Sequence, residues 1–532
     1  MLKGLFKARF SLSNNTINSL ILLMIELMKL LLNCLLSLIL ISRVSSSWTA
    51  KNMFTFSGVE TGDDFGNSVS LAGDLNGDGY HDIVVGAPLH SYPWPGSDIG
   101  ATYVVYGGET TSLSDINFAS TPNPDPLTTG FFILGNAFGD KFGYSVSCAG
   151  DVNNDGYDDI IIGAPFKSNA QGAIYVIYGG KNQDFSNLDL SSQSLDPSTT
   201  GFMITGEAAS GYFGYSVSNS GDINYDGYAD IFIGAPGREE VYVIYGGEKS
   251  SMSNIDLSSV TLDPATTGFT LKGSVSGDYF GCSVNSAGDI DKDGYDDLII
   301  GAWKKNDNRG AAYVVYGGKK SIMSNIDLSK VTLKPATTGF TLQGKVAGDE
   351  FGFSVSSAGD FNNDGYDDVI VGAVNVGGGQ GAAYIIYGGK KSAMANIDLS
   401  KVTLDPAKTG LEIVGDVVGD RFGASVSCAG DINKDGYDDV LIGADKKDPY
   451  SQGAAYAIYG GAKSTLSNMQ LSKVTLDPAT NGFVIIGSYQ GAEFGNSISS
   501  GDINNDGVSD FLIGAWTEET SPGFAYTFVS GN

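Results

Sequence analysis

The sequence predicts an all-β fold, namely a seven-bladed β-propeller of four-stranded antiparallel blades that is closed by the N-terminal strand. Three observations predict it. One motif recurs seven times along the 532 residues, its segments are short and rich in β-branched and aromatic residues, and almost no segment shows helical periodicity. Hydrophobic residues at 42% and aromatic residues at 11% are enough to build a core.

Each repeat carries the same succession of strand-like segments. A G-F-x-I-x-G segment precedes a Phe-Gly pair and an S-V-S segment, and an acidic loop then leads to an apolar run ending in Gly-Ala and to a G-A-x-Y-V-x-Y-G-G segment. The Phe-Gly pairs are Phe65-Gly66, Phe142-Gly143, Phe213-Gly214, Phe280-Gly281, Phe351-Gly352, Phe422-Gly423 and Phe494-Gly495. Four strands in each repeat make each repeat one blade.

The two ends of the repeat region predict how the ring closes. Met53 to Gly58 has the form of the strand that follows each Tyr strand, and Phe524 to Val529 is the seventh Tyr strand. The last blade therefore lacks an outer strand that the N-terminal strand can supply. The alternative is an open solenoid of stacked repeats. A connection of about 20 residues, such as Lys319 to Gly339, recurs with little change, so we expect it to pack on the blade edge.

Residues 1–47 differ from the repeats and predict a targeting segment. The chain is almost continuously apolar from Leu20 to Ile41, and the stretch from Met28 has a charged start, an apolar run and small residues at Ser45 to Ser47. We expect a signal peptide, with Met28 as an alternative start, or an uncleaved N-terminal anchor; a buried apolar segment is the third reading. Either of the first two places residues 48–532, the propeller, at the cell surface or in the secreted state.

Charge and cysteine content exclude several classes of function. The 60 acidic and 31 basic residues give a formal charge of −29, which argues against sequence-independent binding to nucleic acid or anionic lipid. Contact with a membrane is expected only through an N-terminal anchor. Cys148, Cys282 and Cys428 fall on the predicted inner strands of non-adjacent blades, too far apart for a disulfide, and are expected to be small buried residues.

Seven acidic loops of the form D-x-[DN]-x-D-G-x-x-D follow the S-V-S segments and predict calcium sites. Calcium takes six to eight oxygen ligands, and we expect side chains at positions 1, 3, 5 and 9 and the carbonyl of position 7 to supply them. The alternative is that the loops are only Asn/Asp/Gly turns, but crowded carboxylates without a cation repel one another. The expected ligands of up to seven Ca²⁺ ions are Asp74, Asn76, Asp78, Tyr80, Asp82, Asp151, Asn153, Asp155, Tyr157, Asp159, Asp222, Asn224, Asp226, Tyr228, Asp230, Asp289, Asp291, Asp293, Tyr295, Asp297, Asp360, Asn362, Asp364, Tyr366, Asp368, Asp431, Asn433, Asp435, Tyr437, Asp439, Asp502, Asn504, Asp506, Val508 and Asp510.

These motifs together resemble FG-GAP repeats, as found in the seven-bladed propeller of integrin alpha chains. The resemblance rests on the Phe-Gly pairs, the acidic loops and the Gly-Ala-Pro triplets that end at Pro88, Pro165 and Pro236. It implies an extracellular, calcium-binding, non-catalytic propeller acting in cell adhesion or in binding a protein, matrix or glycan ligand. The later triplets read GAW, GAV, GAD and GAW, and no thigh or calf region or membrane span precedes Asn532, which argues against an integrin-type beta partner.

The resemblance also points to a ligand face. In integrin alpha propellers the face opposite the calcium loops meets ligand and partner, and here Trp94, Trp303 and Trp516 map to it. Exposed aromatic side chains are common anchors of interfaces, so these three are candidate ligand-binding residues, with nearby Tyr92, Phe166, Tyr212 and Tyr279. The alternative is that Trp303 and Trp516, which stand where other triplets have Pro, pack between blades.

No catalytic constellation is apparent in the sequence. His81 lies inside an acidic loop and His90 is remote from any nucleophile pattern, so neither suggests a Ser/His/Asp arrangement, and no zinc motif occurs. We therefore expect a binding module rather than an enzyme. The alternative is the propeller of a secreted or surface enzyme that acts on glycans or glycolipids, because similar repeats occur in a phospholipase D that cleaves glycosylphosphatidylinositol anchors.

Overall fold

The computed structural model of the chain describes residues 53–91, 98–121, 124–219, 221–447, 451–516 and 522–530. The predicted targeting segment, residues 1–47, lies outside this range, and so does Trp94. Within the described ranges no helix is long and apolar enough to cross a bilayer.

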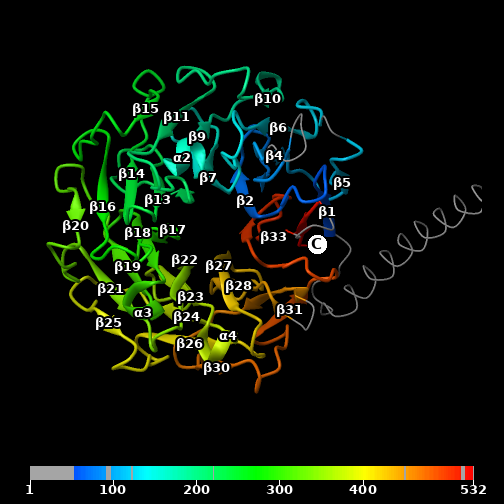
Figure 1. The fold of residues 1–532 in the computed structure, drawn as a ribbon. Coiled ribbons are helices and arrows are strands. Elements are labelled where there is room, and N and C mark those ends of the chain that lie inside the picture. The colour runs from blue at the N-terminus through cyan, green and yellow to red at the C-terminus, as the bar shows by residue number, and fades with distance from the viewer. Residues whose placement is uncertain are drawn as a thin grey trace, which may run out of the picture.

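The described chain forms seven sheets arranged around a central axis, as Figure 1 shows, which confirms the all-β seven-bladed propeller. Within each blade the strands run antiparallel from the axis outward. They are β2 (Ser68–Gly73), β3 (Asp82–Ala87), β4 (Ala101–Val105) and β6 (Gly130–Leu134) in blade 1; β7 (Ser145–Gly150), β8 (Asp159–Ala164), β9 (Ala173–Ile177) and β11 (Gly201–Thr205) in blade 2; β12 (Ser216–Asn219), β13 (Ile231–Ala235), β14 (Glu240–Ile244) and β16 (Gly268–Lys272) in blade 3; β17 (Val284–Gly288), β18 (Asp297–Ala302), β19 (Ala311–Val315) and β21 (Gly339–Gln343) in blade 4; β22 (Phe351–Gly359), β23 (Asp368–Ala373), β24 (Ala382–Ile386) and β26 (Gly410–Val414) in blade 5; β27 (Phe422–Gly430), β28 (Asp439–Ala444), β29 (Ala454–Ile458) and β31 (Gly482–Ile486) in blade 6; and β32 (Ile498–Gly501), β33 (Asp510–Ala515), β34 (Phe524–Phe528) and β1 (Met53–Ser57) in blade 7.

The N-terminal strand closes the ring. Strand β1 pairs antiparallel with β34, with Met53 opposite Phe528 and Ser57 opposite Phe524, and so becomes the outer strand of blade 7. In Figure 1 the blue first strand accordingly lies beside the red last strand. The predicted closure is confirmed, and the open solenoid is excluded.

The expectation of four strands in every blade needs a correction in six of the seven described sheets. There the long connection of the next blade adds a two-residue strand, parallel to the outer strand. These fifth strands are β5 (Ile116–Asn117), β10 (Leu188–Asp189), β15 (Ile255–Asp256), β20 (Ile326–Asp327), β25 (Ile397–Asp398) and β30 (Met469–Gln470). The connection therefore packs on the blade edge, as expected, and covers an otherwise open edge strand.

A side chain in each connection explains why this segment repeats. The amide oxygen of Asn187 accepts the N–H of Phe132 at 3.0 Å, and Asn254, Asn325, Asn396 and Asn468 accept the equivalent N–H from the outer strand of the preceding blade. These N–H groups would otherwise lack a partner at the sheet edge.

The core lies between neighbouring blades. The six residues of the second strand, such as β8, are all buried, and the Phe of each Phe-Gly pair packs against the Tyr of the third strand, as in Phe142 with Tyr175 at 5.1 Å between ring centroids. Gly143 has φ of 85°, and a Cβ there would lie 2.4 Å from the carbonyl oxygen of Ala101 in the preceding blade. Glycine is required where two blades approach this closely.

The inner strands are joined by serine hydroxyls. Ser68 Oγ accepts the N–H of Val146 in the next blade at 3.0 Å, and Ser145 Oγ donates to the Gly214 carbonyl at 2.8 Å. The three cysteines that the structure describes, Cys148, Cys282 and Cys428, form no disulfide, and burial raises the pKa of the Cys282 and Cys428 thiols to about 12. This agrees with their interpretation as packed small residues.

Four helical segments of the described chain are short turns after the second strands or in a connection. They are α2 (Lys167–Ala170), α3 (Lys305–Asn308), α4 (Val376–Gly379) and the 3₁₀ turn η1 (Asn182–Asp184). The first three contain left-handed residues such as Ser168 and Asn306, so they are not regular helices.

Candidate metal centres

The seven acidic loops, numbered here 1 to 7 with their blades, connect the first and second strands and fold alike. In loop 2 the carboxylate of Asp151 accepts the N–H of Asp155 at 3.0 Å and that of Gly156 at 2.8 Å. The same two bonds, from positions 5 and 6 to position 1, recur in every loop. The first carboxylate thus holds the loop in one curved shape.

Two positions in each loop adopt left-handed backbone conformations. Position 6 is always Gly, with φ between 79° and 91°, as the sequence motif predicts. Position 4 was not predicted to be special, yet its φ lies between 51° and 74° in Gly77, Asn154, Tyr225, Lys292, Asn363, Lys434 and Asn505. The frequent Asn and Gly at this position were the available signal, since both tolerate such angles.

The carboxylate at position 9 is fully buried and anchors the loop to the third strand. Asp159 Oδ2 accepts the N–H of Val152 at 3.0 Å and its Oδ1 accepts that of Gly179, in the Y-G-G segment, at 2.7 Å. Burial raises the pKa of this carboxyl in all seven loops, to about 8 for Asp439 and about 7 for Asp510. Carboxylates at positions 1 and 5 add repulsion, which a bound cation would relieve.

The carboxylate at position 8 ties neighbouring loops together. Asp158 Oδ2 accepts the N–H of Asp74 in loop 1 at 2.8 Å, and Asp296, Asp367 and Asp438 repeat this contact with loops 3, 4 and 5. The sequence motif did not indicate this role. At the same position of loop 1, the His81 N–H donates to the Asp502 carbonyl of loop 7 at 3.3 Å. These contacts link loops 3 to 6 in succession, and they link loop 1 to loops 2 and 7.

Position 3 provides the test of whether the loops fit a metal ion. The side-chain oxygens of Asn153, Asn224 and Asn362 are buried and have no hydrogen-bond partner, and each residue is only 5% exposed. In loop 4, carboxylate oxygens of Asp289, Asp291 and Asp293 lie within 4.8 Å of one another. Unpaired buried acceptors beside converging carboxylates suit a hard cation such as calcium.

The remaining three loops satisfy position 3 internally. The amide oxygens of Asn76, Asn433 and Asn504 accept the N–H of position 5 at 2.9 to 3.1 Å. All five predicted positions of every loop are present at one end of the blade. That these residues hold calcium stays a prediction.

The opposite face carries the loops before the Phe-Gly pairs and after the Gly-Ala pairs, and aromatic side chains gather there. Phe166 lies 5.8 Å from Tyr144 and 5.5 Å from Tyr212 between ring centroids. Trp303 lies 5.8 Å from Tyr279 and 6.2 Å from Phe353 of the next blade. Trp303 is half-buried, so it packs between blades and also reaches the surface.

The other two predicted tryptophans are less informative. Trp516 is half-buried at the end of β33, whereas Trp94 and its neighbour Tyr92 lie outside the described residues. The structure therefore brings one of the three predicted tryptophans into an aromatic cluster.

An axial pocket of about 350 Å³ opens among the inner strands and draws on the residue after each Phe-Gly pair. These residues are Asn67, Tyr144, Tyr215, Cys282, Phe353, Ala424 and Asn496. Arg421 donates to Asp445 at 2.8 Å in this pocket and its guanidinium lies 5.3 Å from the centre of the Phe353 ring. Burial raises the pKa of Asp445 to about 6, and one of its oxygens has no hydrogen-bond partner.

His90 occupies a structural position. Its Nδ1 lies 3.1 Å from Asp63 Oδ2, and both residues are buried. Lys167 and Lys305 stand at the equivalent place in their blades and pair with Asp140 and Asp278.

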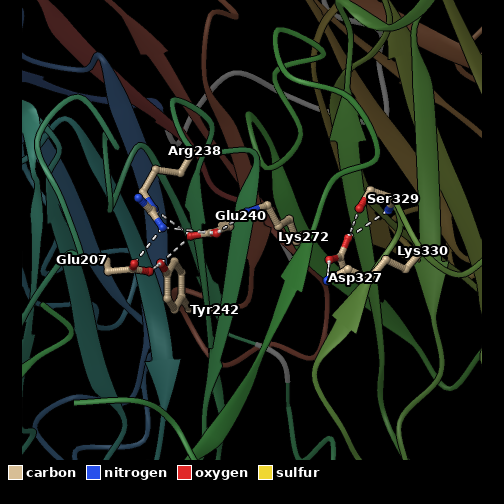
Figure 2. Close-up of polar contacts among 8 residues, drawn as sticks. All are labelled: Glu207, Arg238, Glu240, Tyr242, Lys272, Asp327, Ser329 and Lys330. Carbon is tan, nitrogen blue, oxygen red and sulfur yellow. Dashed lines mark hydrogen bonds and ion pairs between the residues drawn. The ribbon is translucent and has the colours of Figure 1, made fainter. Parts of the chain in front are cut away.

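In blade 3 Arg238 stands at the same place. Its guanidinium bonds Glu207 and Glu240, both at 2.8 Å, and the Tyr242 hydroxyl donates to Glu240 at 2.8 Å (Figure 2). His90 therefore replaces a structural cation.

Comparison with known proteins identifies the repeats. The FG-GAP repeat model matches residues 65–105, 142–177, 213–244, 283–315, 351–386, 422–458 and 494–528. The chain is 31% identical to integrin alpha-V of Gallus gallus over 303 residues and 30% identical to integrin alpha pat-2 of Caenorhabditis elegans over 382 residues, or 55% and 68% of this chain. It is also 30% identical to the phosphatidylinositol-glycan-specific phospholipase D of Dictyostelium discoideum over 312 residues, 56% of this chain.

These alignments cover 25%, 27% and 31% of the three relatives, so the chain spans about a third or less of the length of the curated proteins it matches. The seven matched repeats fall one in each observed blade. The chain is an FG-GAP repeat protein that resembles the β-propeller of integrin alpha chains.

Proposed function

We propose that the protein is a calcium-stabilised extracellular propeller, non-catalytic, that binds a protein, matrix or glycan ligand on the face opposite its acidic loops and so acts in cell adhesion. The observation that carries the proposal is the division of the ring into two faces. One face repeats an oxygen-rich loop seven times, and the other gathers aromatic side chains around an axial pocket.

Calcium is the proposed cofactor because the loops offer carboxylate, amide and carbonyl oxygens rather than nitrogen or sulfur donors. The buried, unpaired oxygens of Asn153, Asn224 and Asn362 would each gain a partner from a cation. Positions 1, 3, 5, 7 and 9 would hold it. When bound, calcium would supply charge neutralisation and rigidity to the loops, and this stabilises the folded ring by mass action.

The aromatic face is the proposed ligand surface. On this face the rings of Phe166 and Tyr212 contact each other at blades 2 and 3, and the rings of Tyr279 and Trp303 contact each other at blade 4. Lys304 Nζ lies 3.5 Å from the centre of the Tyr279 ring, so a cation and aromatic faces are presented together. Such mixed surfaces suit protein interfaces and carbohydrate rings. Trp94 and Trp516 remain candidates, and an integrin-type beta partner is not part of the proposal.

The test is binding of the full chain to an array of glycans and matrix proteins, with and without calcium. The variant carries Phe166→Ala and Trp303→Ala together, and the control is Tyr225→Asn, because Tyr225 is 74% exposed on the acidic-loop face and Asn stands at the same loop position in other blades. We expect the double variant to lose binding while it stays folded, with a melting temperature only a few degrees lower because Trp303 also packs between blades. Retained binding would contradict the proposed surface.

The second candidate is a propeller that belongs to an enzyme acting on glycans or glycolipids. The similarity to the Dictyostelium phospholipase D favours it. Release of a glycosylphosphatidylinositol-anchored protein from vesicles by the purified chain would support this candidate and contradict the non-catalytic proposal.

A further inference from the structure

Four lysines reach from the long connections into the acidic loops of the preceding blades. Lys249 Nζ lies 2.5 Å from Asp155 Oδ2 in loop 2, Lys320 Nζ lies 2.5 Å from Asp226 Oδ2 in loop 3, and Lys391 Nζ lies 2.5 Å from Asp293 Oδ2 in loop 4. Lys463 pairs in the same way with Asp364 in loop 5. We call these four residues the loop lysines. Each contacts position 5, one of the predicted metal-ligand positions.

The loop lysines are held in place by two further contacts. Each ammonium lies over the ring of the Tyr in the Y-G-G segment of the preceding blade, as in Lys249 over Tyr178 at 4.8 Å and Lys320 over Tyr245 at 4.6 Å. The start of the connection is also fixed, since Gly247 N–H donates to the Val152 carbonyl in loop 2 at 2.9 Å. The other two lysines repeat the ring contact at 4.7 and 4.8 Å. The ammonium is therefore a built feature of these loops.

The lysine ammonium groups pair with only some of the oxygens in these loops. It reaches position 5, whereas the buried oxygens of Asn153, Asn224 and Asn362 at position 3 keep no hydrogen-bond partner. Only in loop 4 does a lysine also approach position 3, with Lys391 Nζ 3.0 Å from Asp291 Oδ2. A divalent ion between positions 1, 3 and 5 would contact all of them. Each lysine thus pairs with the carboxylate at position 5 but does not contact all the oxygens that a divalent ion would.

The other loops lack this lysine among the described residues. Asn182 stands at the equivalent position of the connection that faces loop 1, and Thr110 stands at that position facing loop 7, where its hydroxyl oxygen lies 3.2 Å from Asn504 Nδ2. No described lysine pairs with loop 6. In these three loops position 3 is satisfied by the loop backbone. The chain therefore contains its own comparison between loops with and without an ammonium.

We propose that the loop lysines are tethered substitutes for calcium. They hold loops 2 to 5 together when the metal is absent and must leave the position 5 carboxylate when it binds. The inference rests on the proposed calcium binding. Displacing an ion pair costs free energy, and an ammonium that stays nearby repels a divalent cation, so both effects lower calcium affinity at these four loops.

The experiment replaces all four lysines in the full chain by methionine, which keeps the apolar stem over the tyrosine ring: Lys249→Met, Lys320→Met, Lys391→Met and Lys463→Met. Calcium binding is measured by isothermal titration, and the melting temperature is measured in excess EGTA and in calcium. We expect calcium affinity at about four sites to rise about fivefold or more and the melting temperature in EGTA to fall.

The matched control is Lys330→Met with Lys401→Met. These lysines pair with Asp327 and Asp398 at 2.7 Å in the connections, away from the acidic loops, and Figure 2 shows the first of these pairs. We expect neither calcium affinity nor the melting temperature in EGTA to change. A gain of affinity in the control equal to that in the test variant would overturn the proposal, because it would reflect overall charge alone.

The reverse substitution keeps the proposal testable if the quadruple variant does not fold. Asn182→Lys places an ammonium against loop 1, and we expect one site to lose about fivefold in affinity. If neither the quadruple variant nor Asn182→Lys changes calcium affinity while the unaltered chain still binds calcium, the proposed role of the lysines is overturned and the proposed cofactor is not. An unaltered chain that binds no calcium overturns the proposed cofactor as well.

Discussion

The two faces of the ring differ in how closely the seven blades repeat one another. On the acidic-loop face every loop makes the same two backbone bonds to position 1. In every loop the carboxylate at position 9 also accepts a backbone N–H from the segment after the third strand. On the opposite face the residue after the Phe-Gly pair changes from Asn to Tyr, Cys, Phe or Ala around the axis. The acidic-loop face is uniform because the fold and a bound cation would require the same bonds in every blade. The opposite face varies in residue type, and it is the face where a ligand would be recognised.

Of the changes considered, removal of metal from the acidic-loop face should have the largest effect on the stability of the ring. Excess EGTA is expected to lower the melting temperature by about 10 °C or more, because several calcium ions bound only by the folded ring each contribute to its stability. Differential scanning calorimetry of the full chain with and without EGTA makes the measurement, and readdition of calcium is the control. An unchanged transition after verified metal removal would show that the acidic loops are turns alone.

Replacing a position 9 carboxylate should destabilise the fold even without metal. Asp159→Asn leaves one of the N–H groups of Val152 and Gly179 without an acceptor, at a cost of about 1 to 3 kcal/mol in the free energy of unfolding. The neighbouring Asp158→Asn is the matched control, since Asp158 accepts from the Asp74 N–H through one oxygen that an amide retains. Urea denaturation in EGTA compares them, and equal losses would contradict the anchoring role of position 9.

On the opposite face, the buried Asp445 predicts a dependence of stability on pH. Burial raises its pKa to about 6 despite Arg421 and Lys446, with Glu493 also nearby, so the folded chain keeps a proton that the unfolded chain releases near pH 4. Its contribution to stability is present below pH 4 and is lost as the pH rises to about 6. The unaltered chain should therefore lose about 1 to 3 kcal/mol relative to Asp445→Asn across that window.

Urea denaturation at pH 4, 5, 6 and 7 measures this difference. A free-energy difference between the two chains that stays constant from pH 4 to 7 would show that Asp445 ionises normally in the folded state.

The smallest effect on stability is expected from exchanging residues of the variable face. Tyr144→Asn places in blade 2 the residue that blades 1 and 7 carry at Asn67 and Asn496. We expect a shift of only a few degrees in the melting temperature, since Tyr144 lines the axial pocket rather than the core between blades, together with altered ligand binding on the array. Unaltered binding would show that the pocket is not part of the ligand surface.

The sequence predicted what is local and repeated. The ring, its closure by Met53–Ser57 and the positions of the acidic loops follow from spacing and strand pattern, and the structure confirms the ring and its closure. The additional parallel strands, the contact of Asp158 with the preceding loop and the approach of Lys249 to Asp155 were not predicted. These depend on which segments of neighbouring blades meet in space.

The candidate site on the variable face was predicted only in part for the same reason. Trp303 was identified as an aromatic that replaces proline, whereas Arg421 and Asp445 belong to different loops and share no motif. Their pairing appears only when the inner strands converge on the axis. Repetition predicts a symmetric framework, and the differences between copies must be observed in the folded ring.

The most direct test of the account counts bound metal. Equilibrium dialysis of the full chain against calcium, followed by elemental mass spectrometry, should find several calcium ions per chain, up to seven, as many as there are acidic loops. Asp289→Ala, which removes the first carboxylate of loop 4, should lower the count by one. Less than one calcium ion per folded chain at saturating calcium would contradict the claim that these loops are metal sites.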